Sequence, residues 1–215
     1  MTPVETCEVN GFTVEIHYDP DATSPRDDLH DCEMVLEIKN YDLPNDAGVN
    51  LDDFATEQDF MAHLTGSENA LVIQRVYGYI HSGIALNAGE CTYPFNDRWD
   101  SGVAGVAYVT AKNWADTQGT EWTGTVEQVT QAGALIKSDV EAYSQYLNGE
   151  CYGYRILDTD GEEMDSCWGF TGWDDVEQVA EEAANGLTHD PKCNGTLNRR
   201  TGLVEHTSDC PVHTS

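Results

Sequence analysis

Two short segments carry residue types that nucleophilic catalysis uses. His81 and Ser82 stand in a His-Ser-Gly triplet after a predicted strand, and Asp100 and Ser101 stand in an Asp-Ser-Gly triplet before another. A serine nucleophile needs a histidine base that a carboxylate orients, so these four side chains are candidate catalytic residues. The nucleophile elbow Gly-x-Ser-x-Gly is absent from the sequence, however, and Ser-Gly at a strand end is more typical of a turn.

The last 28 residues carry two copies of one metal-binding pair. His189-x3-Cys193 and His206-x3-Cys210 have the same spacing, and the segment between them has apolar pairs on either side of a predicted hairpin turn. Two imidazoles and two thiolates suit tetrahedral Zn²⁺, and four protein ligands leave no position for water. We therefore expect a structural zinc site with His213 outside it. The alternative is a frayed terminus with incidental His and Cys.

Basic residues are scarce enough to be notable. The chain has 10 Lys and Arg against 39 Asp and Glu, so we expect Arg26, Arg75, Arg98 and Arg155 to pair with carboxylates. The aspartates within 19–31 could hold a hard cation, but their spacing differs from that of an EF-hand loop, which favours a solvated acidic loop. Tryptophans near strand or helix ends could line a pocket, with core packing as the alternative.

The overall composition indicates a folded acidic protein. A length of 215 residues suits one domain or one domain plus a small appendage. The formal net charge of −29 excludes a conventional basic nucleic-acid reader, because such proteins neutralise phosphates with clustered Lys and Arg. An apolar content of 40%, with five Trp and ten Tyr, argues against disorder.

The acidity is spread along the chain and has two explanations. It fits a protein from a salt-loving source, whose charged surface stays soluble where the Debye length is only ~3 Å. It also fits a DNA mimic that arrays carboxylates in place of phosphates. Residues 1–10 have no signal-peptide pattern, no window resembles a membrane span, and the seven widely spaced Cys favour a reducing compartment. We expect a cytoplasmic protein that does not enter membranes.

Hydrophobic periodicity predicts an α+β fold with a mainly antiparallel sheet and two or three packed helices. The predicted strands are 11–18, 32–39, 71–80, 103–110 and 151–157, and the predicted helices are 51–64, 126–147 and 171–186. Asn50 is expected to cap the first helix, and Thr125 with Gln128 to form a capping box on the second. Val129, Ile136 and Val140 should face the sheet. We expect one α+β domain over 1–187 and a zinc-binding tail over 188–215.

Five segments resemble a family of uncharacterised proteins carried by phages, plasmids and prophage-like islands. They are IHYDPDATSPRDD (16–28), YGYIHSGIAL (77–86), RWDSGVAGVAYVT (98–110), VEAYSQYLNGECYGYRI (140–156) and DSCWGF (165–170). The resemblance implies a mobile-element context, and that Arg26 and Tyr154 come together with the His-Ser-Gly and Asp-Ser-Gly triplets. Arg26, Tyr154 and Trp168 are therefore candidate binding residues. The residues after Arg26 and the His/Cys tail depart from the family's pattern.

Three functions follow from these features. The first is a non-enzymatic accessory protein of a virus, plasmid or other mobile element from a halophilic microbe, which binds a host or viral macromolecule by anti-defence action or DNA mimicry. The second is a small hydrolase or nucleic-acid-processing enzyme that uses His81 and Asp100. The third is a zinc-dependent interaction module in which Arg199 and Arg200 of the tail touch a protein, or DNA at high salt. A pocket uniting His81, Asp100 and Arg26 would favour the enzyme.

Overall fold

The protein is described by a computed structural model. It describes residues 2–27, 30–81, 83–89 and 100–187, and the backbone of 196–198 and 203–205. The chain divides into two compact units. The terminal unit takes its residues from Met1–His17, Tyr154–Cys167 and Glu177–Ser215, and the central unit consists of Tyr18–Gly153 and Trp168–Val176. The sequence predicts one domain over 1–187. Local periodicity does not reveal a unit that is assembled from distant parts of the chain, so the division could not be predicted in this way.

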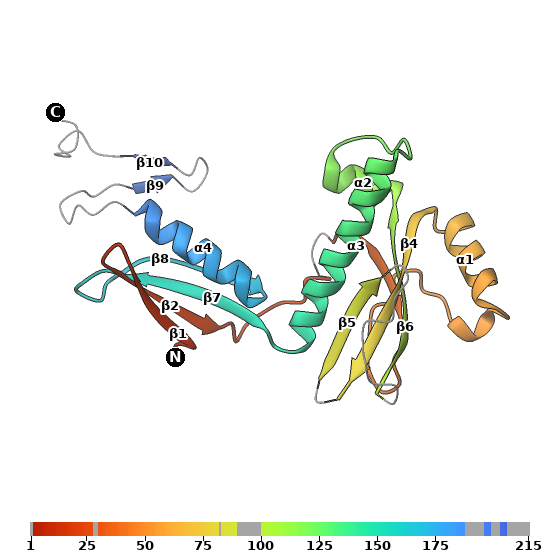
Figure 1. The fold of residues 1–215 in the computed structure, drawn as a ribbon, viewed down its shortest axis with the longest axis horizontal. Helices are drawn as coiled ribbons and strands as arrows, with labels where there is room; N and C mark the ends of the chain where they lie inside the picture. The colour runs from red at the N-terminus through yellow and green to blue at the C-terminus, as the bar shows by residue number, and fades with distance from the viewer. Residues whose placement is uncertain are drawn as a thin grey trace. The chain divides into compact units, whose positions relative to one another are not determined.

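The first sheet combines strands from both ends of the chain. Its order is β1-β2-β7-β8, and α4 lies across one of its faces (Figure 1). The elements are β1 (Glu5–Val9), β2 (Phe12–Tyr18), β7 (Cys151–Leu157), β8 (Glu163–Thr171) and α4 (Trp173–Gly186). Phe12, Val14 and Ile16 are buried while Thr13 and Glu15 are half-buried, so β2 has the predicted alternation as far as Ile16; His17, expected on the polar side, is buried.

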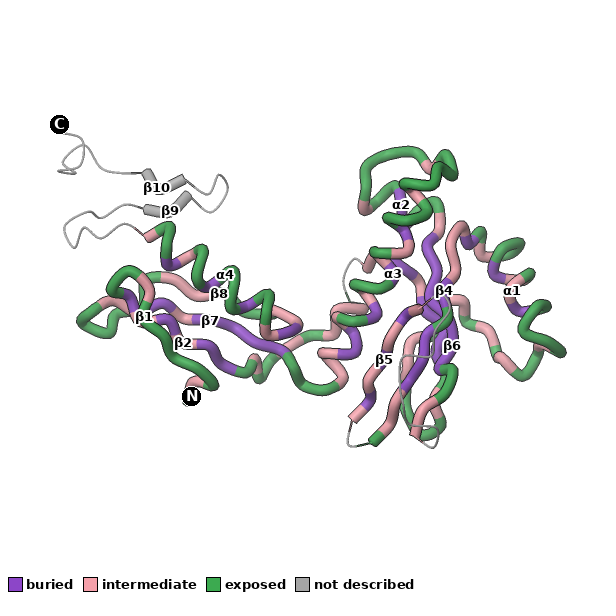
Figure 2. The backbone as a smooth tube through the Cα atoms, in the orientation of Figure 1, coloured by how far each residue is buried: buried purple, intermediate pink, exposed green. Residues whose placement is uncertain are grey.

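The second sheet is antiparallel and has the order β3-β6-β4-β5. Its strands are β3 (Glu33–Leu36), β4 (Ala70–Ile80), β5 (Ile84–Gly89) and β6 (Ser101–Thr110). Gly105 of β6 pairs with Leu36 of β3 and has a φ of 147°, and a Cβ there would lie 2.0 Å from the Val35 carbonyl oxygen. Only glycine fits this close approach of two backbones. In Figure 2 the middle of β4 and β6 is largely buried.

Helices cover both faces of the second sheet (Figure 1). α3 (Val126–Leu147) packs on one face through Ile136, Val140 and Tyr143, as predicted, and α1 (Glu57–Gly66) packs on the other. Val129 is 44% exposed, so the prediction that it faces the sheet is wrong. Val126 in the first turn of α3 is exposed as well, and the buried stripe begins at Ala132.

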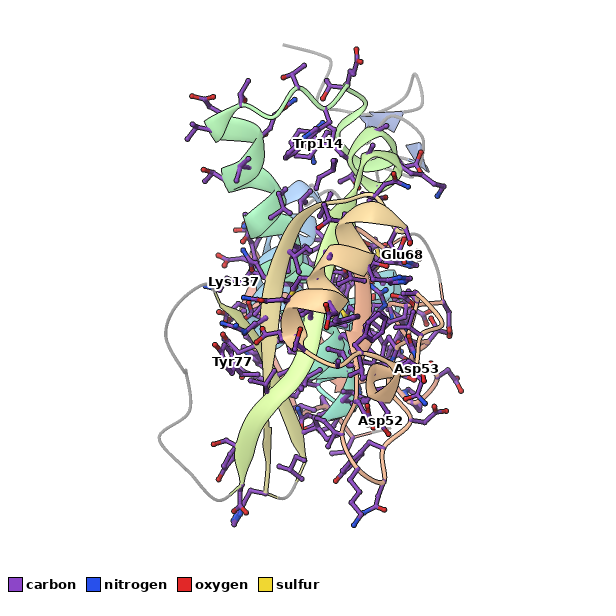
Figure 3. All side chains as sticks on the ribbon, turned by 90° about the vertical axis from the view of Figure 1, so that its right-hand side faces the viewer. Asp52, Asp53, Glu68, Tyr77, Trp114 and Lys137 are labelled. Carbon is purple, nitrogen blue, oxygen red and sulfur yellow. The ribbon has the colours of Figure 1, made fainter. Side chains whose placement is uncertain are left out.

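Side-chain caps explain where the helices begin. Thr125 accepts a hydrogen bond from the Gln128 amide, as expected for the cap of α3. Asn50, however, caps the short 3-10 helix η1 (Leu51–Asp53), and Thr56 caps α1, so the predicted helix 51–64 is two elements. A further helix, α2 (Ala111–Gln118), was not predicted. Figure 3 shows Trp114 of α2 at the end of the sheet, where it is buried.

The fold class is therefore α+β, with four α-helices and two antiparallel sheets among residues 2–187 as described. In the tail, β9 (Thr196–Asn198) and β10 (Leu203–Glu205) pair antiparallel. The predicted zinc ligands His189, Cys193, His206 and Cys210 lie outside the described residues, as does His213. None of the described helices is long and apolar enough to cross a membrane.

Candidate functional sites

The structure brings His81 and Asp100 together at one end of the central sheet. The Ile80 amide donates to the Asp100 carbonyl oxygen at 2.7 Å, which joins the end of β4 to the residue before β6. His81 Nδ1 then lies 3.3 Å from Asp100 Oδ2. The two side chains are 70% and 43% exposed. This pairing follows from strand register alone, since neither side chain is enclosed by the fold.

A catalytic triad is not assembled around this pair in the part of the chain that the structure describes. Ser82 lies outside the described residues. Ser101 Oγ is buried without a described hydrogen-bond partner, so it does not contact His81. A cavity of about 410 Å³ is lined by Asp100 and Ser101 with Gly78, Gly102 and other neighbours, but no histidine is among its described lining. Asp100 thus connects this cavity with the His81 imidazole, which is not itself part of the described lining.

Arg26 belongs to a different, more buried cluster. Its side chain is only 8% exposed. Nη1 donates to the Cys32 carbonyl oxygen at 2.8 Å and to Asp139 Oδ2 at 2.9 Å, and Nη2 lies 2.5 Å from Asp46 Oδ2. These contacts fasten the loop before β3 to α3. Arg26 thus pairs with carboxylates as predicted, but it contacts Asp46 and Asp139 rather than Asp100.

Two other arginines also pair as the sequence predicts. Arg75 contacts Glu57 at 2.6 Å, and Arg155 contacts Glu163 at 2.7 Å and Glu15 at 3.5 Å. Arg98 lies outside the described residues. The three described arginines, Arg26, Arg75 and Arg155, are each paired with specific carboxylates, so they do not form a basic patch.

The two aromatic candidates have unlike environments. Tyr154 is 4% exposed, and its hydroxyl donates to Asp165 Oδ2 at 3.1 Å. Burial, followed by the Asp165 charge, raises the pKa of the Tyr154 phenol well above its usual range. Trp168 lies in β8 and is 41% exposed. Tyr154 therefore acts as a core residue, whereas Trp168 presents aromatic surface.

A third group of side chains was not singled out from the sequence. His30, Glu33 and Asp46 each place one ligand atom within 4.8 Å of the others. Asn113 Nδ2 donates to Glu33 Oε1 at 3.0 Å, and the Met34 amide donates to Asp46 Oδ2 at 2.6 Å. His30 and Glu33 are three residues apart, which is a weak signal, and Asp46 joins them only through the fold.

The terminal unit carries more uncompensated negative charge for its length than the central unit does. Its residues 2–17, 154–167 and 177–187 contain eleven Asp and Glu but a single Lys or Arg, Arg155. We call Glu5 and Glu8 of β1 with Glu177 and Glu181 of α4 the α4–β1 acidic face; all four are exposed. Burial raises the pKa of the Cys7 thiol, and these four carboxylates raise it further, so all four lie near this thiol.

Comparisons with known proteins assign no function to these sites. No protein-family model matches the chain, and no curated protein or solved structure matches it. The argument for function therefore depends on the charge, burial and geometry of the described residues.

Proposed function

We propose that this protein is a non-enzymatic accessory protein of a mobile element in a salt-loving microbe. It binds the positively charged surface of a host or viral macromolecule through the α4–β1 acidic face. The observation that carries the proposal is that Glu5, Glu8, Glu177 and Glu181 are exposed and lie near one another and Cys7, in a unit where Arg155 is the one described Lys or Arg and is already paired.

The clustering of like charges on the α4–β1 acidic face lowers the stability of the fold, which a surface that only keeps the protein soluble does not require. Glu177 and Glu181 are one helical turn apart, and like charges at that spacing destabilise a helix by about 0.2–0.5 kcal/mol. Glu5 and Glu8 of the neighbouring strand add to the repulsion. A patch of one sign attracts and orients a partner of the opposite sign, which raises the association rate. The cost is therefore offset when a basic partner binds.

Cys7 gives the acidic face a neutral centre. The raised pKa keeps its thiol protonated near neutral pH, and a protonated thiol behaves as a small apolar group. Protein interfaces commonly have an apolar centre and a polar rim. The exposed His81–Asp100 pair supports an enzyme less strongly, because it lacks an adjoining nucleophile in the described chain and Arg26 contacts other carboxylates.

The proposal is tested by changing the charge of the face and of a matched surface. The face variant carries Glu5→Gln, Glu8→Gln, Glu177→Gln and Glu181→Gln. The control carries Asp52→Asn, Asp53→Asn, Glu121→Gln and Glu127→Gln, four exposed carboxylates of the central unit, two of which are labelled in Figure 3. Both variants change the net charge by the same amount. Each is used, beside the parent, to capture proteins from host lysate at low and at molar salt.

We expect the parent and the control to capture the same partner and the face variant to lose it. Duplex DNA added in excess should release the partner if the face stands in for phosphates. Equal loss in both variants would show that total charge, not this face, governs binding. Capture that is undiminished in the face variant would also overturn the proposal.

The hairpin in the tail supports a second function. β9 and β10 pair in the register Leu203↔Asn198 to Glu205↔Thr196, so the two His/Cys pairs of the sequence flank one antiparallel ribbon. We propose that His189, Cys193, His206 and Cys210 hold one structural zinc ion, which makes the tail a zinc-dependent interaction module. Elemental analysis should find one zinc per chain, lost in Cys193→Ser and Cys210→Ser. Undiminished zinc in both variants would contradict the assignment.

A further inference from the structure

His30, Glu33 and Asp46 converge from three places in the central unit. His30 ends the loop before β3, Glu33 opens β3, and Asp46 follows the isolated bridge between Val35 and Asn45. His30 Nε2 lies 3.3 Å from Glu33 Oε2. Their ligand atoms and one from Asp46 lie within 4.8 Å of one another, which is the separation expected of groups that share one metal ion.

The carboxylates of this cluster are already held in position by neighbours. Asn113 occupies Glu33 Oε1, which leaves Oε2 toward His30. The Met34 amide and Arg26 Nη2 occupy Asp46 Oδ2, which leaves Oδ1 available. Partners that orient ligands in this way are typical of metal sites, where they limit the rearrangement that binding requires.

The charges of the cluster do not balance. The side chains of Glu33, Asp46 and Asp139 are 25%, 25% and 9% exposed, and Arg26 contacts Asp46 and Asp139 but not Glu33. Among the described residues, three carboxylates therefore share one guanidinium, which leaves two negative charges in a partly buried place. Such charge is costly unless it is paired or coordinates a cation, and a divalent ion matches it in magnitude.

Arg26 supplies an independent sign of a missing group. Its side chain is 8% exposed, and its Nε is a buried donor without a hydrogen-bond partner among the described residues. In a planar guanidinium the Nε–H and one Nη2–H point the same way. Because Nη2 contacts Asp46, the edge of the guanidinium that carries the unpartnered Nε–H lies next to this carboxylate. A water bound to a metal ion there would accept this hydrogen bond.

We propose that His30 Nε2, Glu33 Oε2 and Asp46 Oδ1 bind one divalent cation of the Mn²⁺ type. One imidazole and two carboxylates combine nitrogen and oxygen donors that suit such a first-row ion, and three protein ligands leave positions for water. One of these waters accepts from Arg26 Nε. The ion ties the loop before β3 to the sheet, and this role is separate from partner binding by the α4–β1 acidic face.

Mn²⁺ binding to the full-length protein tests the site. Electron paramagnetic resonance measures free Mn²⁺ during titration at about 1 M KCl, where screening weakens loose association with the acidic surface. The parent background carries Cys193→Ser and Cys210→Ser, so that the tail cannot contribute thiolates. We compare His30→Ala and Glu33→Gln with the control His63→Ala, whose histidine lies 3.7 Å from Glu68 without a third ligand.

We expect one Mn²⁺ per chain in the background, and at least about a tenfold loss of affinity in His30→Ala and Glu33→Gln. His63→Ala should stay within twofold. Far-UV circular dichroism confirms that each variant is folded, and Glu33→Gln keeps the shape of the side chain if His30→Ala disturbs the loop. Binding of less than half an equivalent, or equal affinity in all three variants, would overturn the site. The acidic-face variant should keep its Mn²⁺, so this result and the partner experiment fail separately.

Discussion

Replacing Arg26 by Ala should strongly destabilise the central unit. Arg26 is 8% exposed and contacts Asp139, which is 9% exposed. Without the guanidinium, Asp139 remains among buried groups with only the amide and thiol of Cys32 near one of its oxygens. Removing one partner of a buried ion pair costs about 3–5 kcal/mol, because the other charge is left uncompensated. We expect Arg26→Ala to fall in that range.

Three further variants separate charge from packing. Arg75→Ala removes an ion pair whose side chains are 46% and 54% exposed, and such pairs are worth only about 0–1 kcal/mol. Arg26→Lys keeps the charge but cannot reach Asp46, Asp139 and the Cys32 carbonyl at once, so its loss should be intermediate. Arg26→Ala with Asp139→Asn should be less destabilised than Arg26→Ala alone, since the orphaned charge is gone.

Urea denaturation followed by far-UV circular dichroism at about 1 M KCl gives the free energy of unfolding for each variant. Salt at that level weakens exposed pairs and affects buried ones much less, which widens the contrast with Arg75→Ala. If Arg26→Ala lowers the free energy of unfolding by an amount within about 1 kcal/mol of that for Arg75→Ala, the burial argument is refuted. If the double variant loses as much free energy of unfolding as Arg26→Ala and Asp139→Asn lose when added together, the role of the Asp139 charge is refuted.

Three other outcomes follow from packing, net charge and titration. Ile136→Ala should cost about 2–5 kcal/mol in urea denaturation and Lys137→Ala almost nothing, because Ile136 is fully buried and Lys137 is exposed; equal losses would mean that the stripe does not face the sheet. The melting temperature should rise from 0.1 to 3 M KCl as salt screens the −29 charge, and an unchanged value would contradict salt adaptation. Burial, then Asp139, raises the pKa of Cys32, so its contribution to stability is complete below about pH 8.5 and declines as pH rises further; Cys32→Ala should flatten this alkaline loss.

Long, regular patterns made parts of the fold predictable. The apolar spacing of 126–147 and the run 151–157 match α3 and β7 at both ends, because α3 has a buried stripe from Ala132 to Ser144 after a side-chain cap, and β7 is buried over most of its length. β1 could not be found in this way, since all but one of its five residues are exposed and it has no apolar alternation. α2 buries only Asn113 and Trp114 over eight residues, which is too short a stripe to detect.

The site contacts, like the fold, could be predicted where nearby residues decide them and could not be predicted where distant segments meet. His81 and Asp100 meet because each adjoins the end of a predicted strand, and strand register decides their contact. The carboxylates of Arg26 lie 20 and 113 residues away in sequence, so pairing could be expected but the partners could not be named. His30 and Glu33 look unremarkable until Asp46 is placed beside them by the bridge at Val35.

Salt sets a condition on any partner of the α4–β1 acidic face. At molar salt the Debye length is about 3 Å, so the long-range attraction that would guide a basic partner at low salt is largely absent. Binding must then depend on groups in direct contact, where water and salt are excluded from the ion pairs. The neutral Cys7 thiol within the four carboxylates offers such a contact. A complex that survives molar salt should therefore weaken when Cys7 becomes Asp, whereas one seen only at low salt should respond to net charge alone.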